Sequence, residues 1–276
     1  MLFRSSTPAV RRENGGFALI IVLWTLVLIA FIVVHLTATG RTEVRIATNI
    51  VANAVAQAAA DGAIFEAIFN LSDPQPEQRW PVDGNAREVS IGNSRVTIRL
   101  EDEAWWINPN SASPALLEAS LRFTGSDPES ARRVANAIGE WVGSAPAPRP
   151  PNVLLADYRA AGFDYRPPGA PLETLNELGR CSASPVLAAI RPHLTLFGPP
   201  EPSAGTIDPF VAAALTEAAQ AAPAPSPAQP PPDVLTIRIT ATALGSRDAR
   251  VARSAVVRIG AALPLGYQVL AWRDGF

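Results

Sequence analysis

The residues from Phe17 to Val34, FALIIVLWTLVLIAFIVV, form an apolar run of 18 residues in which Thr25 is the only polar side chain. Extended to Leu36, the run would form a helix about 30 Å long, which matches the hydrocarbon core of a bilayer. An ordinary signal peptide ends its apolar run after about 7–15 residues at a cleavage site between small residues. No such site follows here, so the sequence predicts a transmembrane helix over residues 17–36.

Basic residues precede the apolar run and predict its orientation. Arg4, Arg11 and Arg12 lie before it, with Glu13 as the only acid in that stretch. Because positive residues remain on the cytoplasmic side of a bilayer, residues 1–16 are predicted to be cytoplasmic and the chain after Leu36 is predicted to lie outside.

The boundary between the basic segment and the apolar run is Gly15-Gly16-Phe17. A basic leader, a glycine and then a phenylalanine that opens an apolar helix are typical of prepilin-type leaders. This pattern predicts cleavage after Gly16, which would leave Phe17 as the new N-terminus. The alternative that remains open is an uncleaved signal anchor, in which the glycines only begin the helix.

The helix is predicted to continue beyond the membrane. No proline occurs between Pro8 and Pro74, so one helix of about 80 Å can extend from Phe17 to about Leu71. Its apolar positions recur at three- and four-residue steps, which predicts packing on a soluble domain. These positions are Val44, Ala47, Val51, Val55, Ala58, Gly62, Phe65 and Phe69. Arg41, Glu43 and Arg45 lie at the membrane exit, where we expect a solvated collar.

Strand patterns flank a block of helical patterns. Residues 87–100 alternate on both sides of Gly92-Asn93-Ser94 and predict a hairpin, and strand signals return at 234–244, 254–259 and 267–272. Strands on both sides of a helical block predict one antiparallel sheet interrupted by an insertion, an α+β fold.

The block itself contains repeated helix starts, each with a capping residue directly before a proline. They are Ser113-Pro114, Asp127-Pro128, Ser184-Pro185 and Asp208-Pro209. Two proline-rich stretches, Ser144–Asn152 and Ala221–Pro232, are predicted linkers.

Several segments resemble, in order, pieces of the type II secretion system protein K family of minor pseudopilins. They are RTEVRIATN (41–49), EDEAWWINPNSAS (101–113), IGEWV (138–142), PGAPLETLNELGR (168–180), IRPHLTLFG (190–198), AVVRIG (255–260) and YQVLAWRDG (267–275). The resemblance implies a pilin-like fold, in which a long N-terminal helix packs on a small antiparallel sheet and a large all-helical domain is inserted. The implied parts are the leader 1–16, the transmembrane helix 17–36, its periplasmic continuation 37–71, the first part of the β-domain 72–108, the helical domain 109–220, the linker 221–232 and the second part of the β-domain 233–276.

The resemblance also implies a function. Pilins and major pseudopilins carry glutamate at the fifth position after the cut, whereas the family resembled here lacks it, as this chain does at Ile21. The implied protein is held in the cell inner membrane, is cleaved by prepilin peptidase and is methylated at Phe17. With the minor pseudopilins I, J and H it would start or cap a filament that exports folded proteins through an outer-membrane channel. A minor pilin of a type IV pilus or competence system, and an uncleaved membrane-anchored periplasmic binding module, are the alternatives.

Composition argues against most other functions. The formal net charge is −2 and all 23 basic residues are arginine, which disfavours nucleic-acid binding. Cys181 is the only cysteine and is predicted to be a small buried residue, so neither a disulfide framework nor a cysteine zinc site is expected. His35 and His193 are the only histidines, and no nucleophile motif accompanies them. We expect no enzymatic activity.

The run Glu101-Asp102-Glu103 does not predict a metal site, because calcium needs six or more converging oxygens and no DxDxDG loop is present. Members of the resembled family bind calcium through acidic loops of the helical domain. The matching segment, Ser144–Asn152, contains no acid. No metal or other cofactor is therefore predicted.

Overall fold

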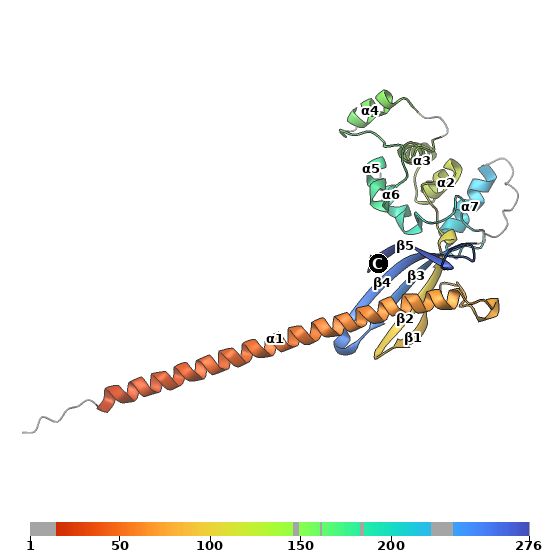
Figure 1. Cartoon of the computed structure of the whole chain (residues 1–276). Coiled ribbons are helices and arrows are strands. Elements are labelled where there is room, and N and C mark those ends of the chain that lie inside the picture. The colour runs from red at the N-terminus through yellow and green to blue at the C-terminus, as the bar shows by residue number, and fades with distance from the viewer. Residues whose placement is uncertain (1–14, 146–148, 161, 183–184, 222–233, 276) are drawn as a thin grey trace, which may run out of the picture. The chain divides into compact units, whose positions relative to one another are not determined.

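The computed structural model describes residues 15–145, 149–160, 162–182, 185–221 and 234–275 (Figure 1). The chain separates into two compact units, Met1–Val55 and Ala56–Phe276. Helix α1, Gly15–Leu71, forms the described part of the first unit and continues into the second. Its 57 residues confirm the expectation of one uninterrupted helix, although it begins at Gly15, two residues before the predicted start.

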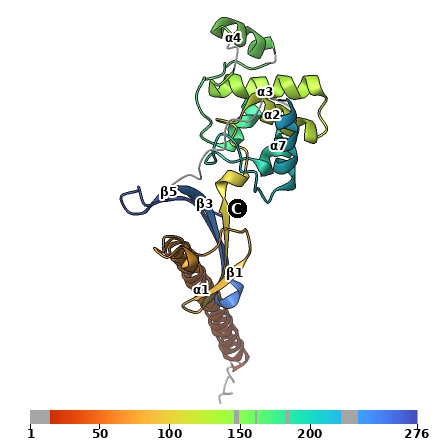
Figure 2. The same ribbon diagram turned by 90° about the vertical axis from the view of Figure 1, so that its right-hand side faces the viewer.

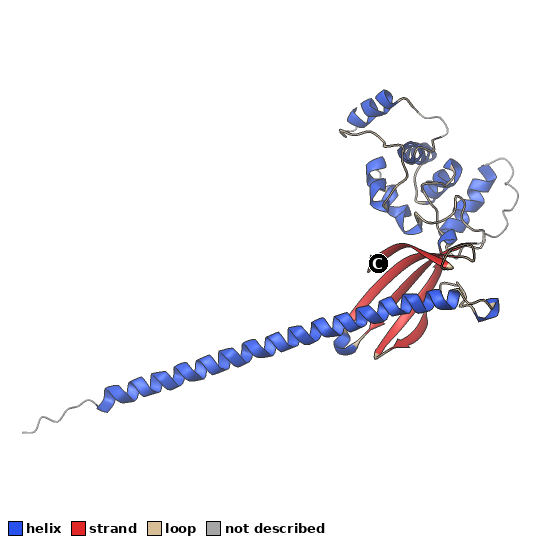
Figure 3. Ribbon diagram, in the orientation of Figure 1, coloured by secondary structure: helices blue, strands red, loops and turns tan. Residues whose placement is uncertain are grey.

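The second unit contains one antiparallel sheet with the strand order β1–β2–β3–β4–β5 (Figure 3). The strands are β1 Arg87–Ile91, β2 Ser94–Asp102, β3 Leu235–Leu244, β4 Arg250–Ile259 and β5 Tyr267–Asp274. β1 and β2 form the predicted hairpin, and Gly92 in its turn has a φ of 57°, which glycine adopts without steric cost. β2 pairs directly with β3, so the inserted helices interrupt the sheet in sequence but not in space.

The face of α1 that is buried in the second unit consists mainly of alanine. Its buried members are Ala56, Ala59, Ala60, Ala63, Ile64, Ala67, Ile68 and Leu71. Phe65 and Phe69, which the sequence pattern placed on the packed face, are 51% and 74% exposed. That prediction was wrong because the buried face is offset from the predicted positions. Ala59, Ala63 and Ala67 are buried, whereas the predicted Ala58 is exposed and Gly62 is half-buried. The small side chains of the buried face allow the helix backbone to approach its neighbours closely.

One arginine of the sheet, Arg253, forms ion pairs with both α1 and the end of β5. Arg253 of β4 is 8% exposed at its side chain, and its Nε lies 3.0 Å from Oδ1 of Asp61 in α1. The same guanidinium binds Asp274 at the end of β5. On the same side of the sheet, the ring of Phe65 lies 5.7 Å from that of Trp272. These contacts assign the inner face of the sheet to α1.

The inserted block is helical, as predicted. Its α-helices are α2 Pro114–Phe123, α3 Pro128–Val142, α4 Pro151–Ala160, α5 Leu178–Cys181, α6 Val186–Ile190 and α7 Pro209–Ala221. Short 3₁₀ turns occur inside the block, at η3 Leu175–Glu177 and η4 Arg191–His193. Others lie outside it, at η1 Pro76–Gln78, η2 Glu103–Trp105 and η5 Ser246–Asp248.

Three of the predicted helix starts are confirmed by their hydrogen bonds. Ser113 accepts from the backbone N–H of Leu116, and Asp127 accepts from that of Ser130. Asp208 accepts from the backbone N–H of Phe210 at 2.8 Å, at the start of α7. At the fourth predicted start, Ser184 lies outside the described residues, and α6 begins at Val186.

Each of the two predicted linkers overlaps the end of a helix and extends outside the described residues. Helix α4 begins at Pro151, inside the segment predicted as a linker, because proline is well accommodated in the first turn of a helix. Residues 146–148 of that segment lie outside the described residues. The second predicted linker begins at Ala221, the last residue of α7, and its remaining residues also lie outside the described part.

The helical block has a hydrophobic core of its own. Figure 2 shows α2, α3 and α7 packed together, and the core extends to α5 and α6. All buried members of this cluster come from residues 107–218, among them Leu121, Ile138, Ile190 and Val211. The described sheet residues take no part in it. Sheet and block therefore bury their apolar side chains separately.

Candidate functional site

The first candidate site is the apolar part of α1. Residues Phe17–Leu36 have a mean hydropathy of 3.2, and none of this segment is buried within the structure. The hydroxyl of Thr25 donates to the backbone carbonyls of Ile21 and Val22, both at 2.9 Å. Because the only polar side chain of Phe17–Val34 is satisfied within the helix, the surface of the helix over these residues is compatible with lipid. The segment is long and apolar enough to cross a bilayer.

The sequence-predicted site residues all fall on α1. Gly16 lies in its first turn, Phe17 is 73% exposed and Ile21 is 48% exposed. Glu43 and Arg45 are exposed on the same helix, whereas the side chain of Arg41 lies outside the described part. The structure therefore places these residues along one element, helix α1.

The second candidate site is a buried ion pair where the chain leaves the sheet and enters the helical block. The side chain of Glu103 in η2 is fully buried. Its Oε1 lies 2.9 Å from Nε of Arg238 in β3, and its Oε2 lies 3.1 Å from Nη2 of the same guanidinium. The guanidinium carbon of Arg238 also lies 5.7 Å from the centre of the Trp106 ring.

The helical block contributes the remaining contacts to this pair. The hydroxyl of Thr195 donates to Oε2 of Glu103, and the backbone N–H of Phe197 donates to that hydroxyl oxygen at 3.1 Å. A Cβ added at Gly198 would lie 2.6 Å from the backbone oxygen of Glu103, so this close approach requires glycine. The sequence alone does not reveal this site, because Glu103, Thr195 and Arg238 are far apart in the chain.

Backbone hydrogen bonds also stabilise this junction, the place where the chain leaves the sheet and enters the helical block. Ile107 and Leu194 form a parallel bridge, in which the N–H of Ile107 donates to the carbonyl of His193 at 3.0 Å. The N–H of Thr195 donates to the carbonyl of Ile107 at 2.9 Å. Burial raises the pKa of the neighbouring Asp102, whose carboxylate accepts from the N–H of Ala104 at 2.8 Å. The junction is thus held by hydrogen bonds and an ion pair as well as by packing.

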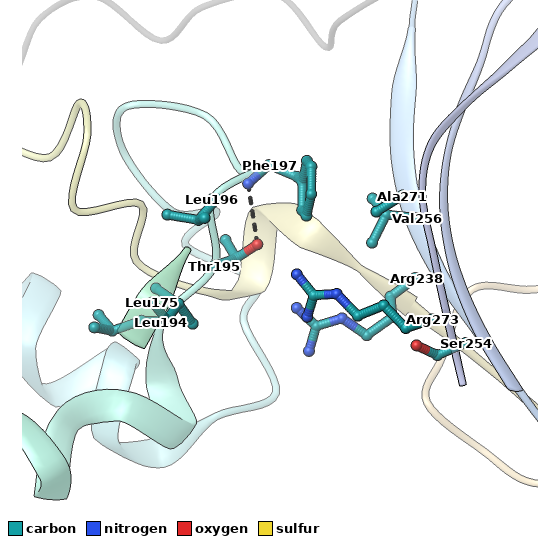
Figure 4. A pocket seen from close by; sticks show the side chains of 10 residues that line it. All are labelled: Leu175, Leu194, Thr195, Leu196, Phe197, Arg238, Ser254, Val256, Ala271 and Arg273. Atoms are coloured by element: carbon teal, nitrogen blue, oxygen red, sulfur yellow. Dashed lines mark hydrogen bonds between the residues drawn. The ribbon is translucent and has the colours of Figure 1, made fainter. Parts of the chain in front are cut away.

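A small pocket of about 30 Å³ adjoins the junction (Figure 4). It is lined by residues of the helical block and by residues of β3, β4 and β5. Its polar lining includes Thr195, Arg238, Ser254 and Arg273, and its apolar lining includes Phe197. Figure 4 shows the side chains of Arg238 and Arg273 lying next to each other and extending toward the loop that contains Thr195.

The residues with possible catalytic chemistry have structural partners. Nδ1 of His193 lies 2.6 Å from Oδ2 of Asp208, and its ring stacks on that of Phe210 with centroids 4.1 Å apart. Burial raises the pKa of the Cys181 thiol to about 12, which keeps the thiol protonated at neutral pH. Both side chains stabilise the helical block.

Carboxylates close to the segment Ser144–Asn152 are paired with a cation of the chain itself. Arg149 places Nε 2.6 Å from Oε1 of Glu140 and Nη1 2.5 Å from Oδ2 of Asp157. Within the described part of the chain, no group of three or more His, Cys, Asp or Glu side chains is arranged to hold a metal ion.

Comparison with known proteins identifies the fold. No protein-family model and no curated protein matches the chain. A chain in the crystal structure of the GspK–GspI–GspJ complex from the type 2 secretion system of enterotoxigenic Escherichia coli is similar, with a TM-score of 0.51 and 15% sequence identity. The similarity covers 86% of this chain and 99% of that chain. The predicted pilin-like α+β fold, with an N-terminal apolar helix and a small antiparallel sheet, is therefore confirmed.

Proposed function

We propose that this protein is a minor pseudopilin of a type II secretion system, of the protein K type. One observation carries the proposal. A helix able to cross a membrane leads into an antiparallel sheet that a helical block interrupts, and the chain with this arrangement is similar over 86% of its length to a chain of the GspK–GspI–GspJ complex. In this role the protein is a component of an assembly and not a catalyst.

The apolar part of α1 would anchor the protein in the inner membrane. Arg4, Arg11 and Arg12 favour a cytoplasmic N-terminus, so the sheet and the helical block would lie in the periplasm. Prepilin peptidase would cleave after Gly16, and the new amine of Phe17 would be methylated. Arg41, Glu43 and Arg45 would then follow the membrane exit and form a solvated collar at the membrane surface.

Ile21 supports a position at the filament tip. An ionised carboxylate in lipid is costly unless it pairs with a cation. In a helical filament, the glutamate of an incoming subunit meets the free amine of the subunit above it, and a tip subunit has no such neighbour. Its own Phe17 amine remains available to the subunit below. An isoleucine at this position therefore suits a subunit at the filament tip, which has no subunit above it.

The helical block supports the same position. It is a folded body with its own core, and such a body is difficult to accommodate among the closely packed subunits of a filament shaft. At the tip it meets no subunit above. There the protein would act with minor pseudopilins I, J and H, and would start or cap the filament that moves folded proteins through the outer-membrane channel.

Copurification tests this proposal. The full chain, coexpressed with minor pseudopilins I, J and H of the same gene cluster and extracted in detergent, is expected to copurify with I and J. The matched control is coexpression with minor pilins of a type IV pilus, which should not copurify. Association with the pilus subunits alone would favour the pilus alternative, and association with neither set would contradict the proposal.

A further inference from the structure

The sheet has a second face, opposite to the one that faces α1. Val96, Ile98 and Leu100 of β2 are fully buried on the inner face, so the side chains that alternate with them project from the outer face. Strand register extends this assignment across the sheet. The arginines of the outer face are Arg95, Arg99, Arg238, Arg250, Arg258 and Arg273.

The positive charge of this face exceeds its negative charge. The register places only Glu88 and Glu101 on the same face, and the ion pair between Glu88 and Arg95 is long, at 3.8 Å, and exposed. Among the described residues, four of the arginines have no carboxylate within ion-pair distance. They are Arg99, Arg250, Arg258 and Arg273, all of them exposed. Since the whole chain has a net charge of −2, this face is a local concentration of positive charge.

Four residues whose side chains donate hydrogen bonds form a row across strands β2, β3, β4 and β5 on this face. Arg99 of β2 pairs with Thr240 of β3, Thr240 pairs with Ser254 of β4, and Ser254 pairs with Arg273 of the edge strand β5. The row carries two guanidinium groups and two hydroxyl groups, and no carboxylate. Its Arg273 end lies at the pocket beside the buried ion pair.

The pocket is arranged to receive a negative group. Glu103 holds Arg238 through Nε and Nη2 and neutralises its charge, so the second arginine of the pocket, Arg273, leaves one positive charge unbalanced. The hydroxyl of Ser254 supplies a further donor. The pocket is small, at about 30 Å³, so it suits a carboxylate better than a bulky phosphate ester.

We propose that the outer face of the sheet docks the acidic surface of a partner subunit, and that one aspartate or glutamate of that partner enters the pocket and binds Arg273. The guanidinium of an arginine matches a carboxylate with two parallel hydrogen bonds, which gives orientation as well as attraction. Arg99, Arg250 and Arg258 extend the positive surface around this contact. The identity of the partner as another minor pseudopilin rests on the proposed function, whereas its acidic chemistry rests on the charge of this face.

Charge reversal at the two ends of the donor row tests the inference. The full-length double variant Arg99→Glu/Arg273→Glu, in detergent, is expected to bind full-length minor pseudopilins I and J about tenfold more weakly or worse. Its affinity should also change less with salt than that of the wild type, because the attraction between the surfaces has been removed. The variant Arg273→Lys keeps the charge but loses the two-pronged contact, so we expect an intermediate loss.

The matched control is Arg159→Glu/Arg180→Glu, which makes the same change in net charge on exposed side chains of the helical block. It should bind like the wild type, and both double variants should keep the thermal stability of the wild type. Equal weakening in both double variants would assign the effect to net charge and overturn the inference. Unaltered binding by Arg99→Glu/Arg273→Glu would overturn the docking face while leaving the proposed function intact. Failure of the wild type to bind I or J would count against both.

Discussion

Replacing Arg238 with methionine is expected to lower the free energy of unfolding by about 3–5 kcal/mol, because the substitution leaves a buried carboxylate without its cation. The side chain of Glu103 is fully buried, and two of its contacts come from Arg238. The hydrogen bond from Thr195 would remain, but a hydroxyl does not balance the charge. Methionine retains an unbranched side chain beside Trp106, so lost packing contributes little. Denaturant unfolding of the full chain in detergent measures the effect.

The double variant Glu103→Gln/Arg238→Met separates charge from packing. It removes both charges, so most of the lost stability should return. Glu103→Gln alone should cost less than Arg238→Met, since the guanidinium that it leaves unpaired is 29% exposed at its side chain and can reach water. Equal destabilisation by Arg238→Met and by the double variant would show that the buried charge is not the cause.

Deletion of residues 109–220 is expected to abolish copurification with the partner pseudopilins while membrane insertion is retained. The deletion removes nearly the whole of the core cluster formed by residues 107–218, and the buried residues of the sheet belong to a different core. The apolar segment of α1 lies in the other unit and is unchanged. The wall of the pocket that contains Thr195 and Phe197 would be lost with the block.

Two measurements on the same membranes test the deletion. Resistance of the shortened chain to alkaline extraction establishes insertion, and affinity purification through this chain measures bound I and J. The double variant Arg159→Glu/Arg180→Glu changes two exposed side chains, so we expect the block to stay folded, and it is the control for general changes to the block's surface. Retention of both partners by the shortened chain would contradict a role for the helical block in the complex.

Much of the fold could be predicted because its signals are local. A helix without proline, a glycine turn between two alternating segments and capping residues before prolines each act within a few residues of sequence. These signals gave α1, the β1–β2 hairpin and the starts of α2, α3 and α7 correctly. The orientation of α1 on the sheet is not local, and there the apolar pattern selected Phe65 and Phe69 in place of the alanine face.

The junction site could not be predicted for the same reason. Glu103, Thr195 and Arg238 lie in three separate parts of the chain, and they meet only because β2 pairs with β3 across the insertion. In sequence, Glu103 belonged to an acidic run that predicted no metal site, and Arg238 lay within the predicted strand 234–244 without an assigned role. By contrast, the processing site at Gly16 and Phe17 depends on adjacent residues, so the sequence alone predicts it.

The mass of the protein isolated from its native membranes distinguishes a processed pseudopilin from an uncleaved membrane anchor. We expect a chain that begins at Phe17 and carries one additional methyl group. A chain that still begins at Met1, in cells whose prepilin peptidase processes other substrates, would contradict it.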